Sequence, residues 1–131
     1  MTAKVTYLGG LRTECTHIQS GTKIITDAPL DNHGKGEAFS PTDLLATSLA
    51  SCMMTIAGIF CENNQIEFHS CSAEIEKIMS SNPRKVEKIV VHIDFTGNNW
   101  DNNTLQKVIL AAKSCPVAKT IEDSVLIEFN F

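Results

Sequence analysis

The sequence lacks any clustered excess of basic residues. Its 131 residues include 11 Lys and Arg against 15 Asp and Glu, so the formal net charge is −4, and the basic residues are scattered along the chain. Nucleic acids and anionic lipid surfaces attract proteins through concentrated positive charge. The composition therefore argues against a protein that binds nucleic acid or is held at a membrane by charge.

Several motifs that would indicate a particular chemistry are also missing. No cysteine–histidine spacing resembles a zinc site, and no glycine-rich loop suits a phosphate group. No nucleophile-elbow motif supports a Ser–His–Asp triad. We therefore expect neither a metal nor a cofactor.

The N-terminus has no apolar core of the kind that a secretory signal peptide carries. We therefore expect a cytoplasmic protein, in which lasting disulfides are rare and transient ones are catalytic or sensory. The chain has five cysteines, and this odd number excludes complete pairing within one chain.

Residues 44–61 form a run without a single charged side chain. The run is shorter than the roughly 20 residues that cross a membrane, and it contains several Ser and Thr residues. A helix that is apolar on every side belongs in a protein core, so we expect a buried central helix and no membrane span. One small sheet cannot cover such a helix, which favours an intertwined homodimer.

The pattern of apolar residues predicts six strands and three helices in one domain over residues 1–131. Gly9 and Gly10 predict the first hairpin turn, and a loop of about a dozen residues, long enough to suspect a functional role, precedes Ser40. The order is β-β-β-α-β-β-α-α-β, an α+β fold. Strands are expected at residues 3–8, 12–18, 22–26, 67–79, 86–95 and 125–129, and helices at about 41–62, 105–115 and 116–122.

Two cysteines stand out as candidates for redox chemistry. Cys52 lies in the apolar helix, where it can be an ordinary core residue, although nearby hydroxyl side chains are more than a core needs. Cys115 precedes Pro116, which suits the first position of a helix, so Cys115 is expected near a helix N-cap. There the helix dipole favours a thiolate, but the residue can equally be a buried cap.

A reactive Cys52 needs a positive partner, because it lies about three turns into its helix and gains little from the helix dipole. Arg12 on the early hairpin is the leading candidate and His17 the second, although Arg12 can also be a plain surface charge. Asp43 can serve as an acid or base, or orient Arg12. Capping the helix that begins after Ser40 is a sufficient explanation for Asp43.

Two segments resemble the OsmC/Ohr family of small thiol proteins: FSPTDLLATSLASCMMT at residues 39–55 and CPVAK at residues 115–119. The resemblance implies an obligate homodimer with active sites at the subunit interface. It also implies that Cys52 attacks a hydroperoxide and forms a sulfenic acid, and that Cys115 resolves it as a disulfide. An external dithiol would then reduce the disulfide. By the same resemblance, Arg12 stabilises the thiolate and polarises the peroxide.

One position departs from the family's organic-peroxide members. They carry a glutamate ten residues before the first cysteine, where this sequence has Thr42, and the nearest acid is Asp43. The chain therefore resembles the broader OsmC-like branch. A non-catalytic dimer that binds a small apolar molecule and a thiol redox sensor stay open as alternatives to a peroxidase.

Overall fold

A computed structural model describes all residues from Met1 to Phe131. The chain forms two compact units, Met1–Leu45 and Ala46–Phe131, and the boundary between them falls inside a helix. The prediction of a single domain stays a prediction.

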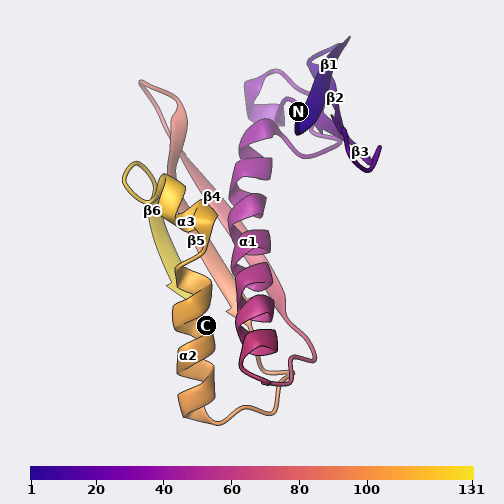
Figure 1. Ribbon diagram of the computed structural model, residues 1–131. Helices are drawn as coiled ribbons and strands as arrows, with labels where there is room; N and C mark the ends of the chain where they lie inside the picture. Colours follow the sequence, from indigo (N-terminus) through magenta and orange to yellow (C-terminus); the bar gives the residue numbers. More distant parts are fainter. The chain divides into compact units, whose positions relative to one another are not determined.

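The first unit is built on a small antiparallel sheet. Its strands are β1 (Ala3–Gly9), β2 (Arg12–His17) and β3 (Lys23–Asp27), in the order β1-β2-β3 (Figure 1). Gly9 and Gly10 form the first hairpin turn, as predicted, and both have the positive φ angles that glycine adopts without strain. After β3, the chain forms a loop with a short 3₁₀ helix, η1 (Leu30–Asn32), and returns to Ser40.

The long helix α1 (Pro41–Asn63) contributes its first residues to one unit and the rest to the other. By length and composition alone it is apolar enough to cross a membrane, a criterion that the core helices of soluble proteins also meet. Its buried residues share one side of the helix and join the core of the second unit. They are Ala46, Leu49, Ala50, Met53, Ala57 and Cys61.

The second unit adds a mixed sheet to α1. Strand β4 (Ser72–Ser80) pairs antiparallel with β5 (Lys85–Asp94), and β5 pairs parallel with β6 (Leu126–Asn130). The parallel pair requires a crossover, which α2 (Asn102–Lys113) and α3 (Pro116–Ile121) supply. Helices α1 and α2 lie on the same face of this sheet (Figure 1).

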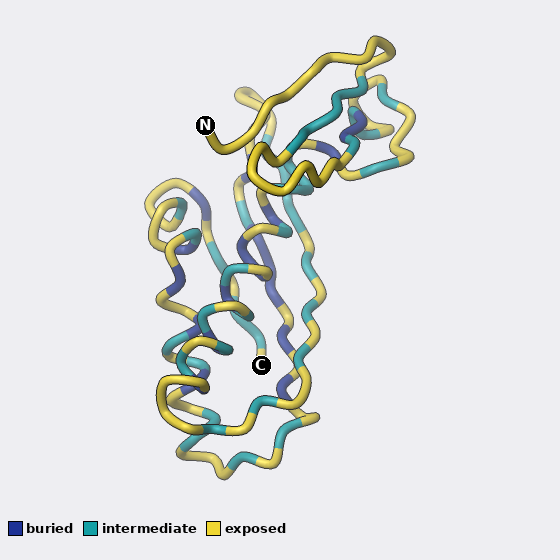
Figure 2. The backbone as a smooth tube through the Cα atoms, turned by 45° about the vertical axis from the view of Figure 1, so that its right-hand side comes forward, coloured by how far each residue is buried: buried dark blue, intermediate teal, exposed yellow.

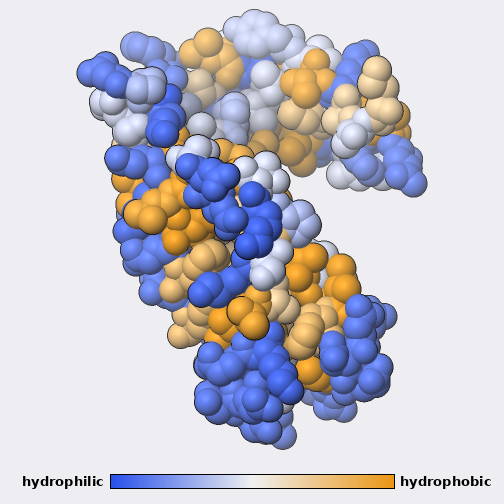
Figure 3. Space-filling view, turned by 60° about the vertical axis from the view of Figure 1, so that its left-hand side comes forward, coloured by the Kyte–Doolittle hydropathy of each residue, from blue (hydrophilic) through white to orange (hydrophobic).

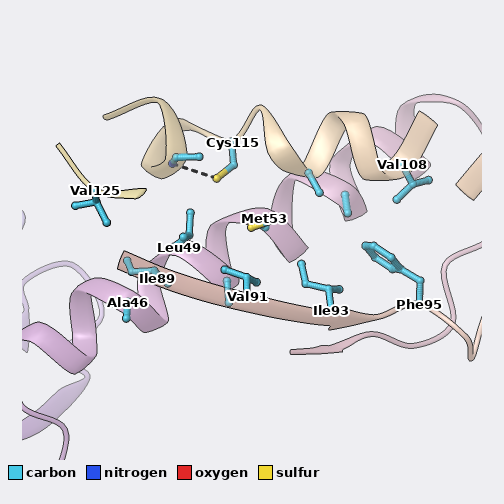
Figure 4. Close-up of a cluster of buried hydrophobic side chains, with 14 of the residues drawn as sticks. Ala46, Leu49, Met53, Ile89, Val91, Ile93, Phe95, Val108, Cys115 and Val125 are labelled. Atoms are coloured by element: carbon cyan, nitrogen blue, oxygen red, sulfur yellow. Dashed lines mark hydrogen bonds between the residues drawn. The ribbon is translucent and has the colours of Figure 1, made fainter. Parts of the chain in front are cut away.

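The core of the second unit lies between that sheet face and the helices. Ile89, Val91 and Ile93 alternate along β5 and point toward Leu49 and Met53 of α1 (Figure 4). These five side chains are at most 3% exposed. Burial is concentrated in this unit, whereas the strands of the first unit are mostly exposed (Figure 2). The core therefore fixes α1, and with it Cys52, against the sheet.

The observed element order confirms the predicted α+β fold, but one predicted strand was too long. Strand β4 begins at Ser72, whereas the alternation of residues 67–79 predicted an earlier start. The amides of His69 and Ser70 donate to the side chain of Asn98, at 2.7 and 3.3 Å. Since the backbone is bonded to a loop side chain here, these residues do not join the sheet ladder.

Hydrophobic side chains reach the surface of both units (Figure 3). The first unit has the densest set, since its three strands bury almost nothing by themselves. A sheet with an apolar face is stabilised by burying that face against another element. The exposed apolar side chains of this unit include Val5, Tyr7, Leu8, Leu11, Ile18 and Ile24.

Candidate active site

Cys52 is a free thiol on α1 in the second unit. It is half-buried and packs against the core formed by α1, the sheet and α2. A cavity of about 620 Å³ opens beside this helix, between α1 and β4. Its lining mixes apolar side chains with three hydroxyl groups and consists of Thr47, Ala50, Ser51, Met54, Thr55, Phe68, Ala73 and Ile75.

Cys115 is fully buried and is the N-cap of α3, with Pro116 at the first helical position, as predicted. Its Sγ accepts a hydrogen bond from the backbone N–H of Ala118 at 3.4 Å (Figure 4). The cap is expected to favour a thiolate, but burial outweighs it. Burial raises the pKa of Cys115, the neighbouring Cys52 thiol raises it further, and the Ala118 N–H lowers it.

The effect of Cys52 on the pKa of Cys115 shows that the two candidate cysteines are neighbours in the fold. Cys52 and Cys115 are 63 positions apart, yet the two thiols are close enough for Cys52 to raise the pKa of Cys115. Both thiols are free in the structure. The packing of α1 against the segment between α2 and α3 therefore creates a dithiol from two distant parts of the chain.

Two of the other three cysteines, Cys61 and Cys71, are placed as packing residues of the core. Cys61 is buried in the core, and burial raises its pKa. Cys71 is half-buried just before β4, where burial and then the charge of Asp94 raise its pKa. Cys15 lies on β2, with its Sγ 3.9 Å from the hydroxyl of Thr13. A buried thiol with a raised pKa is a poor nucleophile at neutral pH.

Arg12 begins β2 in the first unit and is bound by two carboxylates. Its Nε donates to Oδ1 of Asp27 at 2.7 Å and its Nη2 donates to Oδ2 at 2.9 Å, a forked pair. Nη2 also donates to Oε2 of Glu37 at 3.0 Å. Asp27 is buried, and the bond to Arg12 lowers its pKa.

Asp43 takes part in the start of α1. The backbone N–H of Ser40 donates to Asp43, and the backbone N–H of Asp43 donates to the Ser40 hydroxyl. This reciprocal pattern is a capping box, the role that accounts for Asp43 from sequence alone. His17, the second candidate cation, lies at the end of β2 with its Nδ1 2.6 Å from the Ser20 hydroxyl.

Asp27 and Glu37 are the residues that the sequence reasoning missed. The signal for Asp27 was available, because β2 and β3 pair antiparallel and place Arg12 directly opposite Asp27. Counting outward from His17 and Thr22, which flank the turn at residues 18–21, leads to that pair. Glu37 carries no such signal, since it lies in the loop after β3, where no ladder sets the register. Among the described residues, no group of three or more His, Cys, Asp or Glu could hold a metal ion.

Comparison with known proteins agrees with the resemblance of the cysteine motifs. The family model described as OsmC-like protein matches residues 34–130. A crystal structure from Psychrobacter arcticus 273-4, described as an osmotic stress induced and detoxification response protein, is 48% identical, with a TM-score of 0.93 over 99% of this chain and 94% of the other. A comparison with curated proteins returns no match.

More distant structures share the fold. The organic hydroperoxide resistance protein OsmC from Legionella pneumophila is 20% identical, with a TM-score of 0.77 over 99% of this chain and 96% of the other. The organic hydroperoxide resistance protein OhrB of Bacillus subtilis is also 20% identical, with a TM-score of 0.66 over 99% and 97%. On the family match and the 48% identical relative, this chain belongs to the OsmC-like protein family.

Proposed function

We propose that this protein is a thiol-dependent peroxidase that reduces hydroperoxides, preferentially organic ones. The observation that supports this most is the dithiol of Cys52 and Cys115, formed by residues far apart in sequence. Family membership supports it as well, because structures of the same fold are named organic hydroperoxide resistance proteins. The protein would serve in stress defence in the cytoplasm.

The difference in burial supports different roles for the two cysteines. Cys52 is half-buried, whereas Cys115 is fully buried and has a raised pKa. The attacking group must be an accessible thiolate, so attack falls to Cys52. Its sulfur takes the distal peroxide oxygen, the O–O bond breaks, and the alkoxide leaves and takes up a proton. Cys52 is then a sulfenic acid and the product is an alcohol.

Cys115 completes the reaction. Its sulfur displaces the hydroxyl group of the Cys52 sulfenic acid, and water leaves with the Cys115 proton. The resulting disulfide is returned to two thiols by an external dithiol, which is itself oxidised. The role that the family resemblance implies for Arg12, stabilising the Cys52 thiolate, stays a prediction.

We propose that the active form is a homodimer. The first unit exposes large apolar side chains, among them Val5 at 62% and Tyr7 at 64%. Large apolar side chains exposed to this extent are typical of protein interfaces, where a partner surface covers them. Light scattering coupled to size-exclusion chromatography should give twice the mass of one chain, and a monomer mass at micromolar concentration would contradict the proposal.

The test of the peroxidase is hydroperoxide consumption with dithiothreitol as reductant. Hydrogen peroxide and cumene hydroperoxide are compared, with the wild-type protein and three single variants. Cys52→Ser should abolish turnover. Cys115→Ser should also stop the cycle, and it should leave a sulfenic acid on Cys52 that dimedone labels. Cys15→Ser is the matched control, because Cys15 lies on β2 and outside the dithiol.

The assay distinguishes results that support the peroxidase from results that refute it. Turnover lost in both dithiol variants and kept in Cys15→Ser supports the proposal, and the ratio of the two substrates gives the preference. A folded wild-type protein with free thiols that consumes neither peroxide would refute it.

The cavity between α1 and β4 favours a second candidate, a binding protein for a small apolar molecule. Its volume of about 620 Å³ falls within the usual range for ligand pockets. Such a protein would keep its ligand after Cys52→Ser. Binding of a hydrophobic fluorescent probe by Cys52→Ser, without peroxide turnover by the wild type, would favour this candidate.

A further inference from the structure

We infer that the second unit carries a binding site for a small organic cation, an ammonium group attached to an aromatic or aliphatic body. The site is a cavity of about 390 Å³ formed by the end of β5, the segment that follows it, the start of α2 and Phe131, and we call it the aromatic cavity. It lies within the second unit, and neither Cys52 nor Cys115 lines it. The inference therefore goes beyond the proposed function and does not depend on it.

Three aromatic rings form the apolar wall of the aromatic cavity. The ring centroid of Phe95 lies 5.5 Å from that of Trp100 and 6.1 Å from that of Phe131. Ile93 and Leu105 complete the apolar lining, and Ile93 and Phe95 project from the sheet toward α2 (Figure 4). A cavity of this volume, with aromatic and aliphatic walls and few polar groups, is typical of sites that bind small molecules.

The carboxylate of Asp94 is the charged group of the aromatic cavity. Its Oδ1 accepts from the Thr96 hydroxyl at 2.6 Å and from the Thr96 backbone N–H at 2.8 Å, whereas its Oδ2 accepts no hydrogen bond within the chain. These bonds, first that from the hydroxyl, lower the pKa of Asp94, so the group is ionised at neutral pH. None of the eight lining residues is basic. The negative charge therefore has no counter-ion in the cavity.

Every side-chain donor that lines the aromatic cavity is already used. The hydroxyl of Thr96 donates to Asp94, and the Nε1 of Trp100 donates to the carbonyl of Glu67. The Nδ2 of Asn98 donates to two backbone carbonyls. The side chains thus offer a ligand an acceptor oxygen and the negative faces of aromatic rings, but no donor. This combination suits a cation and disfavours an anion.

A neighbouring ring already binds an ammonium group of the chain itself. The Nζ of Lys113 lies 5.1 Å from the ring centroid of Phe129, within the roughly 6 Å over which a cation is attracted to an aromatic face. Phe129 in turn stacks on Phe131 at 6.3 Å between centroids. The same row of rings therefore holds a cation at Phe129, and at the aromatic cavity it adds the carboxylate of Asp94 to its ring faces.

The test compares binding of phenethylammonium and 2-phenylethanol, which share a carbon skeleton and differ in charge. The fluorescence of Trp100, the only tryptophan, reports binding in the wild type and in three variants. Asp94→Asn removes the charge and keeps an acceptor oxygen for Thr96, and Phe131→Leu removes a ring and keeps apolar contact. Asp123→Asn is the matched control, because Asp123 is exposed between α3 and β6 and does not line the cavity. Circular dichroism confirms that each variant is folded.

Phenethylammonium should bind the wild type with a dissociation constant of about 1 mM, as expected for a ligand of this size. It should bind about 10-fold more tightly than 2-phenylethanol, because an exposed ion pair and a cation–π contact each contribute up to about 5-fold. Asp94→Asn should weaken phenethylammonium by about 5-fold and leave 2-phenylethanol unchanged. Phe131→Leu should weaken phenethylammonium by about 3-fold. Asp123→Asn should match the wild type.

Equal affinity of the wild type for the two probes would overturn the inference, and so would wild-type affinity for phenethylammonium in a folded Asp94→Asn protein. No saturable binding below about 20 mM would overturn it as well. Proton–nitrogen NMR spectra locate the ligand, because the backbone amides of Thr96 and Phe131 should shift. Shifts confined to Thr47 and Thr55, which line the cavity between α1 and β4, would contradict the site. No peroxide is used, so failure of the proposed peroxidase would leave these results unaffected.

Discussion

Ser40 and Asp43 satisfy each other's backbone amides at the start of α1, with bonds of 2.9 Å to the Asp43 carboxylate and 3.0 Å to the Ser40 hydroxyl. Removing a capping side chain costs about 1 kcal/mol, so Asp43→Ala should lower the free energy of unfolding by that amount in urea titration. Asp43→Asn keeps an acceptor oxygen and should stay close to the wild type. Peroxidase turnover lost in a stable Asp43→Asn protein would instead assign Asp43 a part in catalysis.

The sheet-facing side of α1 dominates the stability of the second unit. Leu49 is fully buried beside β5, and truncating such a leucine costs about 2–5 kcal/mol. Leu49→Ala should therefore move the urea midpoint strongly. Leu110→Ala is the control, because Leu110 is 69% exposed on α2, and it should change stability by less than about 0.5 kcal/mol. Equal effects of the two variants would contradict the described core.

The Arg12–Asp27 pair predicts a dependence of stability on acid. The folded-state pKa of Asp27 is lowered, chiefly by the bond to Arg12, so its contribution is complete above the unfolded pKa of about 3.9. The contribution is lost as the pH falls from there through the folded pKa. The wild type should thus lose stability below about pH 4, and Asp27→Asn should lose less over the same range. Denaturant midpoints at pH 7, 4 and 3 measure this, and parallel losses in both proteins would argue against the pair.

The buried thiols should be slow to react. Burial raises the pKa of Cys61, and Cys61 and Cys115 are at most 1% exposed. At pH 7 we expect both to be alkylated at least about 10-fold more slowly in the folded protein than in 8 M urea. Peptide mass spectrometry after timed quenching gives the two rates. Equal rates in folded and unfolded protein would show that these segments open readily.

The only tryptophan, Trp100, makes a hydrogen bond and a stacking contact in the second unit. The Nε1 of Trp100 donates to the carbonyl of Glu67 at 2.7 Å, and its ring stacks on Phe68 at 5.6 Å between ring centroids. Trp100→Phe keeps most of the stacking and loses the hydrogen bond, which should cost about 1 kcal/mol. Urea unfolding followed by circular dichroism measures the loss. No change would mean that the bond to Glu67 contributes nothing.

Local sequence patterns were sufficient to predict those helix starts that depend on residues adjacent in the sequence. Pro41 after Ser40 predicts the start of α1, and Pro116 after Cys115 predicts α3, because capping depends on adjacent residues. The early start expected for β4 was wrong, since the alternation from Glu67 gives no sign that Asn98 takes the amides of this segment. Side-chain bonds to backbone nearly thirty residues away leave no local pattern.

The residues of the candidate site also fall into two groups, those that the sequence predicted and those that it did not. Sequence reasoning selected Cys52 and Cys115 as a pair, and the packing of the second unit brings the two thiols together. It also selected Arg12, but the carboxylates that hold it come from the end of β3 and from the following loop. Asp27 could be found from the hairpin register. The position of Glu37 beside Arg12 depends on the path of the loop after β3, and three-dimensional packing sets that path.

Cys115 holds the start of a helix with the same sulfur atom that the proposed chemistry uses. Helix α3 has only six residues, so it has few internal bonds and depends heavily on that acceptor. A reaction that turns the sulfur away from Ala118 frees the amide of that residue and loosens the first turn of α3. The exchange rate of one backbone hydrogen, at Ala118, would then report the oxidation state of the thiol.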